Sequence, residues 1–132
     1  SLEDLYCYEN KLCGLPKLPE SLEYLDCRDN QLIRLPEFPK NFREIDCSQN
    51  KLTKLPALSE NLGILYCQDN QLTELPELPK GLKVLKCSGN RLTKLPKLPE
   101  GLEILDYRNN PGLELPELPD SIKRLNGEFI KD

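Results

Sequence analysis

The stretch SLEYLDCRDNQLIRLPEFPK, which runs from Ser21 to Lys40, decides the fold because the rest of the chain repeats its pattern. The stretch NLGILYCQDNQLTELPELPK, from Asn61 to Lys80, shares the form x-L-x-x-L-x-C-x-x-N-x-L-x-x-L-P-x-L-P-x. Six such 20-residue periods fill residues 1–120, and residues 121–132 begin a seventh. A fixed period of this length predicts a stack of similar units. We therefore expect a single repeat domain over residues 1–132, with a partial capping repeat at 121–132.

Each period begins with a stretch in which side chains point alternately inward and outward, as around Leu25 and Cys27. This predicts a short strand near Tyr24–Arg28 and at the equivalent place in every repeat. One repeat cannot enclose its own apolar residues, so stacking must close the core and form a right-handed parallel β-solenoid with strands about 4.8 Å apart. The core residues expected in the second repeat are Leu22, Leu25, Cys27, Leu32, Leu35 and Phe38.

The tenth position of every full period is an asparagine, at the point where the chain leaves the strand: Asn10, Asn30, Asn50, Asn70, Asn90 and Asn110. Its amide can satisfy buried backbone groups of its own turn and of the next, which is a structural role. The second half of the period has prolines three residues apart, as in LPELP at residues 75–79. These predict polyproline II segments on the convex side and little or no helix. Binding of these prolines to SH3 or WW domains is disfavoured, because their leucines would have to leave the core.

The pattern L-x-x-L-x-x-x-x-N-x-L-x-x-L-P-x-L-P, together with the closing stretch from Asn109 to Ile122, resembles the short-repeat leucine-rich repeat proteins of bacteria, the YopM and IpaH effector families. The resemblance covers residues 1 to about 125. It implies a leucine-rich repeat solenoid with a parallel β-sheet on the concave face. It also implies that the solenoid binds protein partners inside a host cell. In the IpaH branch, the solenoid delivers substrates to a separate C-terminal ubiquitin-ligase domain.

Three features depart from the family pattern. The family more often has Val or another aliphatic residue where this chain has cysteine, Ser59 replaces a proline, and Pro111-Gly112 displaces a core leucine to Leu113. No ligase domain follows Asp132 and no helical hairpin precedes Ser1 in this sequence. A substrate-recognition fragment of a larger ubiquitin-ligase effector is therefore one alternative to an interaction module of effector type. The near-perfect register also permits a second alternative, an engineered or consensus-like scaffold without an evolved partner.

The composition argues against several classes of function. The formal net charge is −4, which disfavours nucleic acid or an anionic membrane surface as a partner. The chain has no histidine, so it lacks Ser-His-Asp and Cys-His catalytic systems and histidine-containing zinc sites. It has no apolar run of 18 or more residues. We therefore expect no enzyme activity, no cofactor, no metal and no membrane contact, and a protein as the partner.

Five of the six cysteines occupy the same inward position of successive repeats: Cys7, Cys27, Cys47, Cys67 and Cys87. Side chains in a parallel ladder point the same way, so neighbouring Cβ atoms stay about 4.8 Å apart, whereas a disulfide requires about 3.8 Å. A straight row of ligands also cannot surround a tetrahedral ion. We expect reduced core thiols, with Cys13 more exposed. Unpaired thiols favour a reducing, cytoplasmic compartment, which would be the host cytosol for a secreted effector.

If the fifth and seventh positions point inward, the fourth, sixth and eighth positions point outward on the concave face. The candidate partner-binding residues there are Tyr6, Tyr8, Tyr24, Asp26, Arg28, Asp46, Ile64, Tyr66, Gln68, Val84, Lys86, Ile104, Asp106 and Arg108. Adjacent Ile64, Val84 and Ile104 form an outward apolar strip. Such a strip fits an interaction site, and it equally fits the preference of β-branched residues for exposed strands.

Two carboxylates, Asp26 and Asp46, are expected side by side, which costs stability unless it is compensated. Arg28 and Arg43 could neutralise them. Otherwise the pair would be a polar hot spot for a basic partner group or a weak cation site. The first repeat is expected to expose an open strand edge and uncovered leucines, which suggests that Ser1 marks a cut and that the isolated chain frays or pairs end to end through this repeat.

Overall fold

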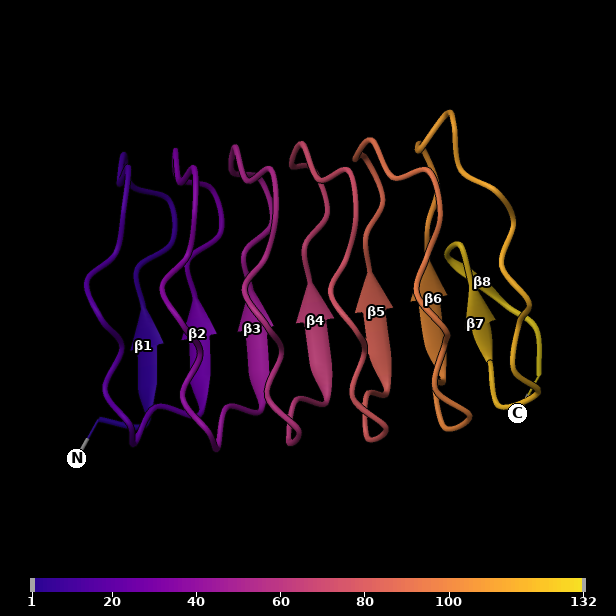
Figure 1. The fold of residues 1–132 in the computed structure, drawn as a ribbon, viewed down its shortest axis with the longest axis horizontal. Coiled ribbons are helices and arrows are strands. Elements are labelled where there is room, and N and C mark those ends of the chain that lie inside the picture. The colour runs from indigo at the N-terminus through magenta and orange to yellow at the C-terminus, as the bar shows by residue number, and fades with distance from the viewer. Residues whose placement is uncertain (1, 132) are drawn as a thin grey trace.

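The computed structural model describes residues 2–131 and consists of one sheet whose short strands follow one another in chain order (Figure 1). The strands are β1 (Asp4–Tyr6), β2 (Tyr24–Asp26), β3 (Glu44–Asp46), β4 (Ile64–Tyr66), β5 (Val84–Lys86), β6 (Ile104–Asp106), β7 (Arg124–Leu125) and β8 (Glu128–Phe129). From β1 to β7 the neighbours are parallel, and each residue faces the residue 20 positions later, as Leu25 faces Ile45. The period of the sequence is therefore the register of the sheet.

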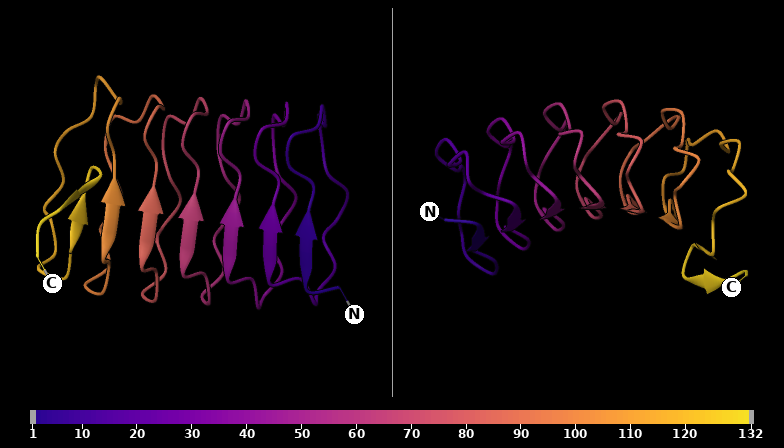
Figure 2. Two further views of the ribbon diagram at one scale, coloured as in Figure 1. Left: turned by 180° about the vertical axis from the view of Figure 1, so that it is seen from behind. Right: turned by 90° about the horizontal axis from the view of Figure 1, so that it is seen from below.

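The stacked repeats form an arc, and the strands line its inner side (Figure 2). The returning half of each repeat is extended and lies on the outer, convex side. Residues 2–131 contain no helix, and hence none long and apolar enough to cross a membrane. The predicted solenoid with a concave parallel sheet and an extended convex side is confirmed.

The strands are shorter than the sequence predicts. The second ends at Asp26 and not at Arg28, and the Asp26 Oδ1 atom accepts a hydrogen bond from the Arg28 backbone N–H at 3.4 Å. Asp29 then takes a left-handed conformation, with a φ of 56°, and turns the chain away from the sheet. The residues equivalent to Asp29 in the other full repeats also have positive φ: Glu9, Gln49, Asp69, Gly89 and Asn109. The tenth-position asparagine follows directly after this turn.

The core is one continuous row of leucines, isoleucines and cysteines between the sheet and the convex segments. Leu25, Ile45 and Leu65 are completely buried, as expected for the fifth position of successive repeats. Phe38 is only partly buried, and its ring stacks on the fully buried ring of Phe42 with centroids 5.0 Å apart. Phe42 therefore occupies the place that leucine has at the second position of neighbouring repeats, and Phe38 covers it from outside.

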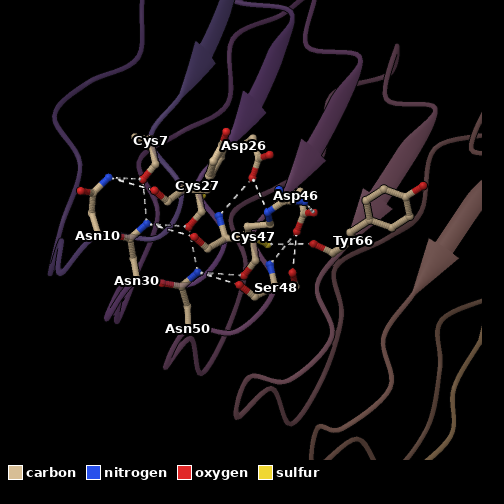
Figure 3. Close-up of polar contacts among 12 residues, drawn as sticks. Cys7, Asn10, Asp26, Cys27, Asn30, Asp46, Cys47, Ser48, Asn50 and Tyr66 are labelled. Atoms are coloured by element: carbon tan, nitrogen blue, oxygen red, sulfur yellow. Dashed lines mark hydrogen bonds and ion pairs between the residues drawn. The ribbon is translucent and has the colours of Figure 1, made fainter.

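The asparagines form a continuous hydrogen-bond ladder along the stack (Figure 3). The Asn50 Nδ2 atom donates to the carbonyl oxygens of Cys47 and Ser48 in its own turn, and to that of Cys27 in the preceding repeat, each at 3.1 Å. Its Oδ1 atom accepts the backbone N–H of Leu32 at 3.0 Å. The structural role is confirmed, but the neighbour is the preceding repeat and not the next one. The amide points back toward the N-terminus because its Oδ1 atom can reach the leucine N–H 18 residues earlier.

All six cysteines are free thiols. Those at positions 27, 47, 67 and 87 are buried, and Cys13 is exposed, as predicted. The Sγ atoms of Cys47 and Cys67 each donate to a carbonyl oxygen of the following repeat at 3.4 Å. Burial raises the pKa of the Cys87 thiol to about 12 and raises the pKa values of Cys27, Cys47 and Cys67 as well. These thiols are consequently protonated, inert core groups.

The C-terminal repeat ends the parallel ladder with a hairpin that the repeat pattern does not predict. Strands β7 and β8 pair antiparallel through Asn126 and Gly127, which have φ values of 52° and 84°. Both are left-handed, as the Asn-Gly pair favours in a tight hairpin. The Asn126 Oδ1 atom accepts the Tyr107 N–H at 3.0 Å, where inner repeats use a backbone carbonyl. The hairpin thus ends the parallel ladder at the C-terminal side, while on the convex side Leu115 remains 77% exposed.

The first repeat is less covered than the inner repeats. Leu5, Cys7, Leu12 and Leu15 are only partly buried, whereas the equivalent residues of the second repeat are buried. The outer edge of β1 pairs with no other strand in residues 2–131. The expected open edge is therefore present, and Ser1 itself lies outside the described residues.

Candidate binding face

The concave face is built from three rows that run across the sheet. The fourth and sixth positions lie within β1 to β6 and stand opposite their counterparts in register. The eighth position lies in the turn just after each strand, where its carbonyl oxygen accepts a hydrogen bond from the preceding repeat. The structure therefore brings the fourteen predicted residues together in three aligned rows. It differs from the prediction in how exposed some of these residues are.

Tyrosines cluster at the N-terminal end of this face. The rings of Tyr6 and Tyr24 lie 5.1 Å apart at an angle of 51°. The Arg28 guanidinium lies over the Tyr8 ring, 4.8 Å from its centroid. Tyr6 is 60% exposed and Tyr8 40% exposed, so their rings are accessible to a partner. Exposed tyrosine beside arginine is typical of the residues that contribute most to protein interfaces.

Asp26, Asp46 and Asp106 lie at the sixth position on the concave side, as predicted, but all three are buried and so offer little surface to a partner. Each carboxylate folds back onto its own turn and accepts the backbone N–H two residues later; for Asp46 this is the Ser48 N–H, at 3.1 Å. The Ser48 hydroxyl also donates to Asp46, at 2.6 Å. An aspartate as the last residue of the strand is the sequence signal for this burial. Aspartate side chains commonly accept a hydrogen bond from the backbone N–H two residues later.

Asp26 and Asp46 do face each other in register, as predicted. Arg28 bridges them, with guanidinium nitrogens 3.7 Å from Asp26 Oδ1 and 3.8 Å from Asp46 Oδ2. Arg43 does not take part, contrary to expectation. Its Nε atom pairs with Glu23 Oε1 at 2.8 Å, because the third position of the preceding repeat is its direct neighbour. One arginine at long range therefore serves two adjacent carboxylates.

The charges of these carboxylates affect the pKa values of acidic groups in the first three repeats. Burial raises the pKa of Asp26, and Asp46 and Glu9 raise it further against the lowering effect of Arg28. Burial, followed by the charges of Asp46 and Asp26, also raises the pKa of Glu44. The N-terminal half of the face is thus incompletely neutralised.

Asp106 is in the opposite situation. The Arg108 side chain donates from Nε and from Nη2 to its two carboxylate oxygens, at 3.0 and 2.6 Å. These hydrogen bonds hold the pKa of Asp106 below its usual range. This carboxylate is therefore fully compensated within its own repeat.

The apolar strip occupies the middle of the face. Ile64, Val84 and Ile104 face one another across β4, β5 and β6, and each is half-buried. Beside the strip, the Lys86 Nζ atom lies 5.3 Å from the centroid of the Tyr66 ring. The Gln68 Oε1 atom is buried and accepts no hydrogen bond within the described structure. Across residues 2–131, no group of three or more acidic or cysteine side chains is arranged to hold a metal ion.

Comparison with known proteins agrees with this geometry. The Leucine Rich Repeat family model matches residues 21–42. YopM from Yersinia enterocolitica WA-314 superposes with a TM-score of 0.88 over 93% of the chain, at 39% sequence identity. The chain is a leucine-rich repeat protein of the YopM and IpaH type. The leucine-rich repeat domain of a Shigella effector matches 80% of it, with a TM-score of 0.79 and 36% identity. YopM from Yersinia pestis matches 93%, with a TM-score of 0.80 and 32% identity.

The matched structures are longer than this leucine-rich repeat chain. It spans 28% of the Yersinia enterocolitica protein, 49% of the Shigella structure and 42% of the Yersinia pestis protein. No curated protein sequence gives a significant match. The leucine-rich repeat fold of effector type is typically a non-catalytic binding module, consistent with protein interaction.

Proposed function

We propose that this leucine-rich repeat chain is a protein-interaction module that binds a protein partner on its concave face. The observation that carries the proposal is the half-buried strip of Ile64, Val84 and Ile104 at the centre of an otherwise polar surface. Apolar groups in the middle of a face with a polar rim are the usual anatomy of a protein interface. The exposed Tyr6 and Tyr8 and the neighbouring Arg28, at the N-terminal end of the same face, belong to the residue types that dominate such interfaces.

The test compares two charge substitutions that are matched in chemistry and differ in place. Val84→Asp puts a charge in the strip, whereas Ile33→Asp puts one at an apolar residue that is 55% exposed outside the three concave rows. Proteins captured by the wild-type chain are purified, and their affinity for each variant is measured by calorimetry. We expect Val84→Asp to weaken binding at least tenfold and Ile33→Asp to leave it unchanged. Equal affinity for all three chains would contradict concave-face binding.

We further infer that the chain works in a reducing compartment. The support is the row of buried free thiols at Cys27, Cys47, Cys67 and Cys87, of which Cys47 and Cys67 donate to backbone carbonyl oxygens. Alkylation during extraction from the native source, followed by mass measurement of the denatured chain, would count its free thiols. Six alkylated cysteines are expected, and a smaller number would contradict the inference.

A further inference from the structure

Two tyrosines of the concave face are already occupied by cations from the chain itself. Arg28 lies over Tyr8, and Lys86 lies over Tyr66. The Tyr6–Tyr24 pair has no such cation from the described residues, although it is the closest aromatic pair on this face. The chain's own contacts show what chemistry these rings accept, because a positive group is attracted to the face of a tyrosine ring.

Tyr24 also has a carboxylate on each side. It faces Asp4 across β1 and Glu44 across β3. Neither carboxylate forms a hydrogen bond or an ion pair with a described residue, in contrast to Asp26, Asp46 and Asp106. Burial raises the pKa of the Tyr24 hydroxyl to about 12, and the charges of Asp26 and Glu44 contribute to the shift. The ring pair therefore lies in a negative field that Arg28 only partly neutralises.

The concave face as a whole is negative in its N-terminal half and slightly positive in its C-terminal half. In the first three repeats, the three concave rows contain four carboxylates and one arginine, a net charge of −3. From the fourth repeat to the seventh they contain Lys86, Arg108 and Arg124 against Asp106 and Glu128, a net charge of +1. The apolar strip begins where the acidic half ends.

We propose that the Tyr6–Tyr24 pair, between Asp4 and Glu44, receives a lysine or arginine side chain of the protein partner, and that an apolar side chain of the same segment contacts the Ile64–Val84–Ile104 strip. This inference rests on the proposed function and names the chemistry of the partner. The negative half of the face would repel the phosphates of a nucleic acid, so the occupant is a basic protein segment.

The spacing of the two contacts restricts the segment. Tyr24 lies in β2 and Val84 in β5, so three strand intervals separate them, about 14 Å at the usual strand spacing. An extended segment covers that distance in roughly four residues. A helix covers it in about nine or ten residues. The basic side chain and the apolar side chain should therefore be separated by one of these two intervals.

A library of random dodecapeptides displayed on phage, selected against the full chain, tests the inference directly because acidic, neutral and basic peptides compete for the same face. Selected peptides are synthesised with a fluorescent label, and their affinities are measured by anisotropy at two salt concentrations. Three variants are compared with the wild type. Glu44→Gln removes a charge beside Tyr24, Glu74→Gln removes an exposed charge outside the concave rows, and Val84→Asp disrupts the strip.

We expect the selected peptides to contain a lysine or arginine at one of the two intervals from an apolar residue. Glu44→Gln should weaken their binding about fivefold at low salt and less at high salt, because one ion pair and its contribution to a cation–π contact are lost. Glu74→Gln should have no effect. Replacing the basic residue of the peptide with glutamine should remove the difference between wild type and Glu44→Gln.

The failures of the two proposals are distinguishable. Peptides that lose affinity with Val84→Asp but are acidic or neutral, or are insensitive to Glu44→Gln, would overturn the basic-segment inference and leave concave binding intact. Peptides insensitive to both substitutions, or no selected peptides at all, would count against concave-face binding and against this inference with it.

Discussion

Replacing the buried Asn50 with alanine should destabilise the chain, because its side chain connects two repeats. The substitution removes three donated hydrogen bonds and one accepted bond. The carbonyl oxygens of Cys27, Cys47 and Ser48 each keep a second donor, respectively Asn30, Asn70 and the Asp29 N–H. The buried Leu32 N–H has no other acceptor among the described residues, so it bears most of the loss.

A buried backbone group left without a partner costs about 1–3 kcal/mol. We therefore expect Asn50→Ala to lower the free energy of unfolding by about 1–3 kcal/mol. With a urea m-value of roughly 2 kcal/mol/M, a loss of about 2 kcal/mol moves the denaturation midpoint by about 1 M. The m-value must be compared between the variants, because repeat proteins can unfold in parts and a changed slope would reveal it.

The chain provides a matched control at the beginning of the same ladder. Asn10 is exposed and donates only to the carbonyl oxygens of Cys7 and Tyr8 in its own turn. Asn10→Ala should therefore change the midpoint by much less than Asn50→Ala. An unchanged midpoint for Asn50→Ala, or equal losses at the two sites, would refute the inter-repeat ladder as a source of stability.

Three further predictions concern thiols, pH and the first repeat. In the folded chain at pH 8, iodoacetamide should modify Cys13 rapidly and Cys27, Cys47 and Cys67 slowly, because burial raises the pKa values of the last three; rapid modification of all six contradicts this. The pKa of Asp106 is lowered by Arg108, so this pair should stabilise the fold above the unfolded-state pKa of about 3.9 and lose that effect as pH falls through the folded-state pKa. Arg108→Gln should therefore reduce the urea midpoint more at pH 7 than at pH 2, and an equal reduction at both values would oppose the linkage. Backbone hydrogen exchange should be faster at Leu5–Tyr8 than at Leu65–Gln68, or the chain should dimerise through β1; a monomer with uniformly slow exchange would contradict both.

The fold was predictable because the repeat length gives the register directly. Once Leu25 is assigned to a strand, Ile45 and Leu65 must lie opposite it, and their inward direction follows from the alternation of side chains. The buried cysteine row and the structural role of the asparagines follow from the same register. The direction of the asparagine bonds was not predictable from the pattern, because the amide stands between two similar repeats and the pattern is the same on both sides.

The hydrogen bonds and ion pairs of the concave face were less predictable, because each polar side chain there has several possible partners nearby. Alternation correctly places Asp26 and Asp46 on the concave side, but it does not show that each carboxylate returns to its own turn. From the sequence, Arg28 and Arg43 were equally good candidates to pair with these aspartates. Only the structure shows that Arg43 pairs with Glu23 instead. Such pairings depend on rotamers and cross-strand neighbours and not on the repeat pattern.

The same carboxylate turns explain where the face remains open. In the second, third and sixth repeats, an aspartate at the sixth position accepts the N–H of the eighth and closes the turn. The fourth and fifth repeats have Tyr66 and Lys86 there instead, and the backbone N–H groups of Gln68 and Ser88 donate to no acceptor among residues 2–131. These two repeats also carry Ile64 and Val84. The centre of the concave face therefore combines apolar side chains with available backbone donors, and closed turns flank it on both sides.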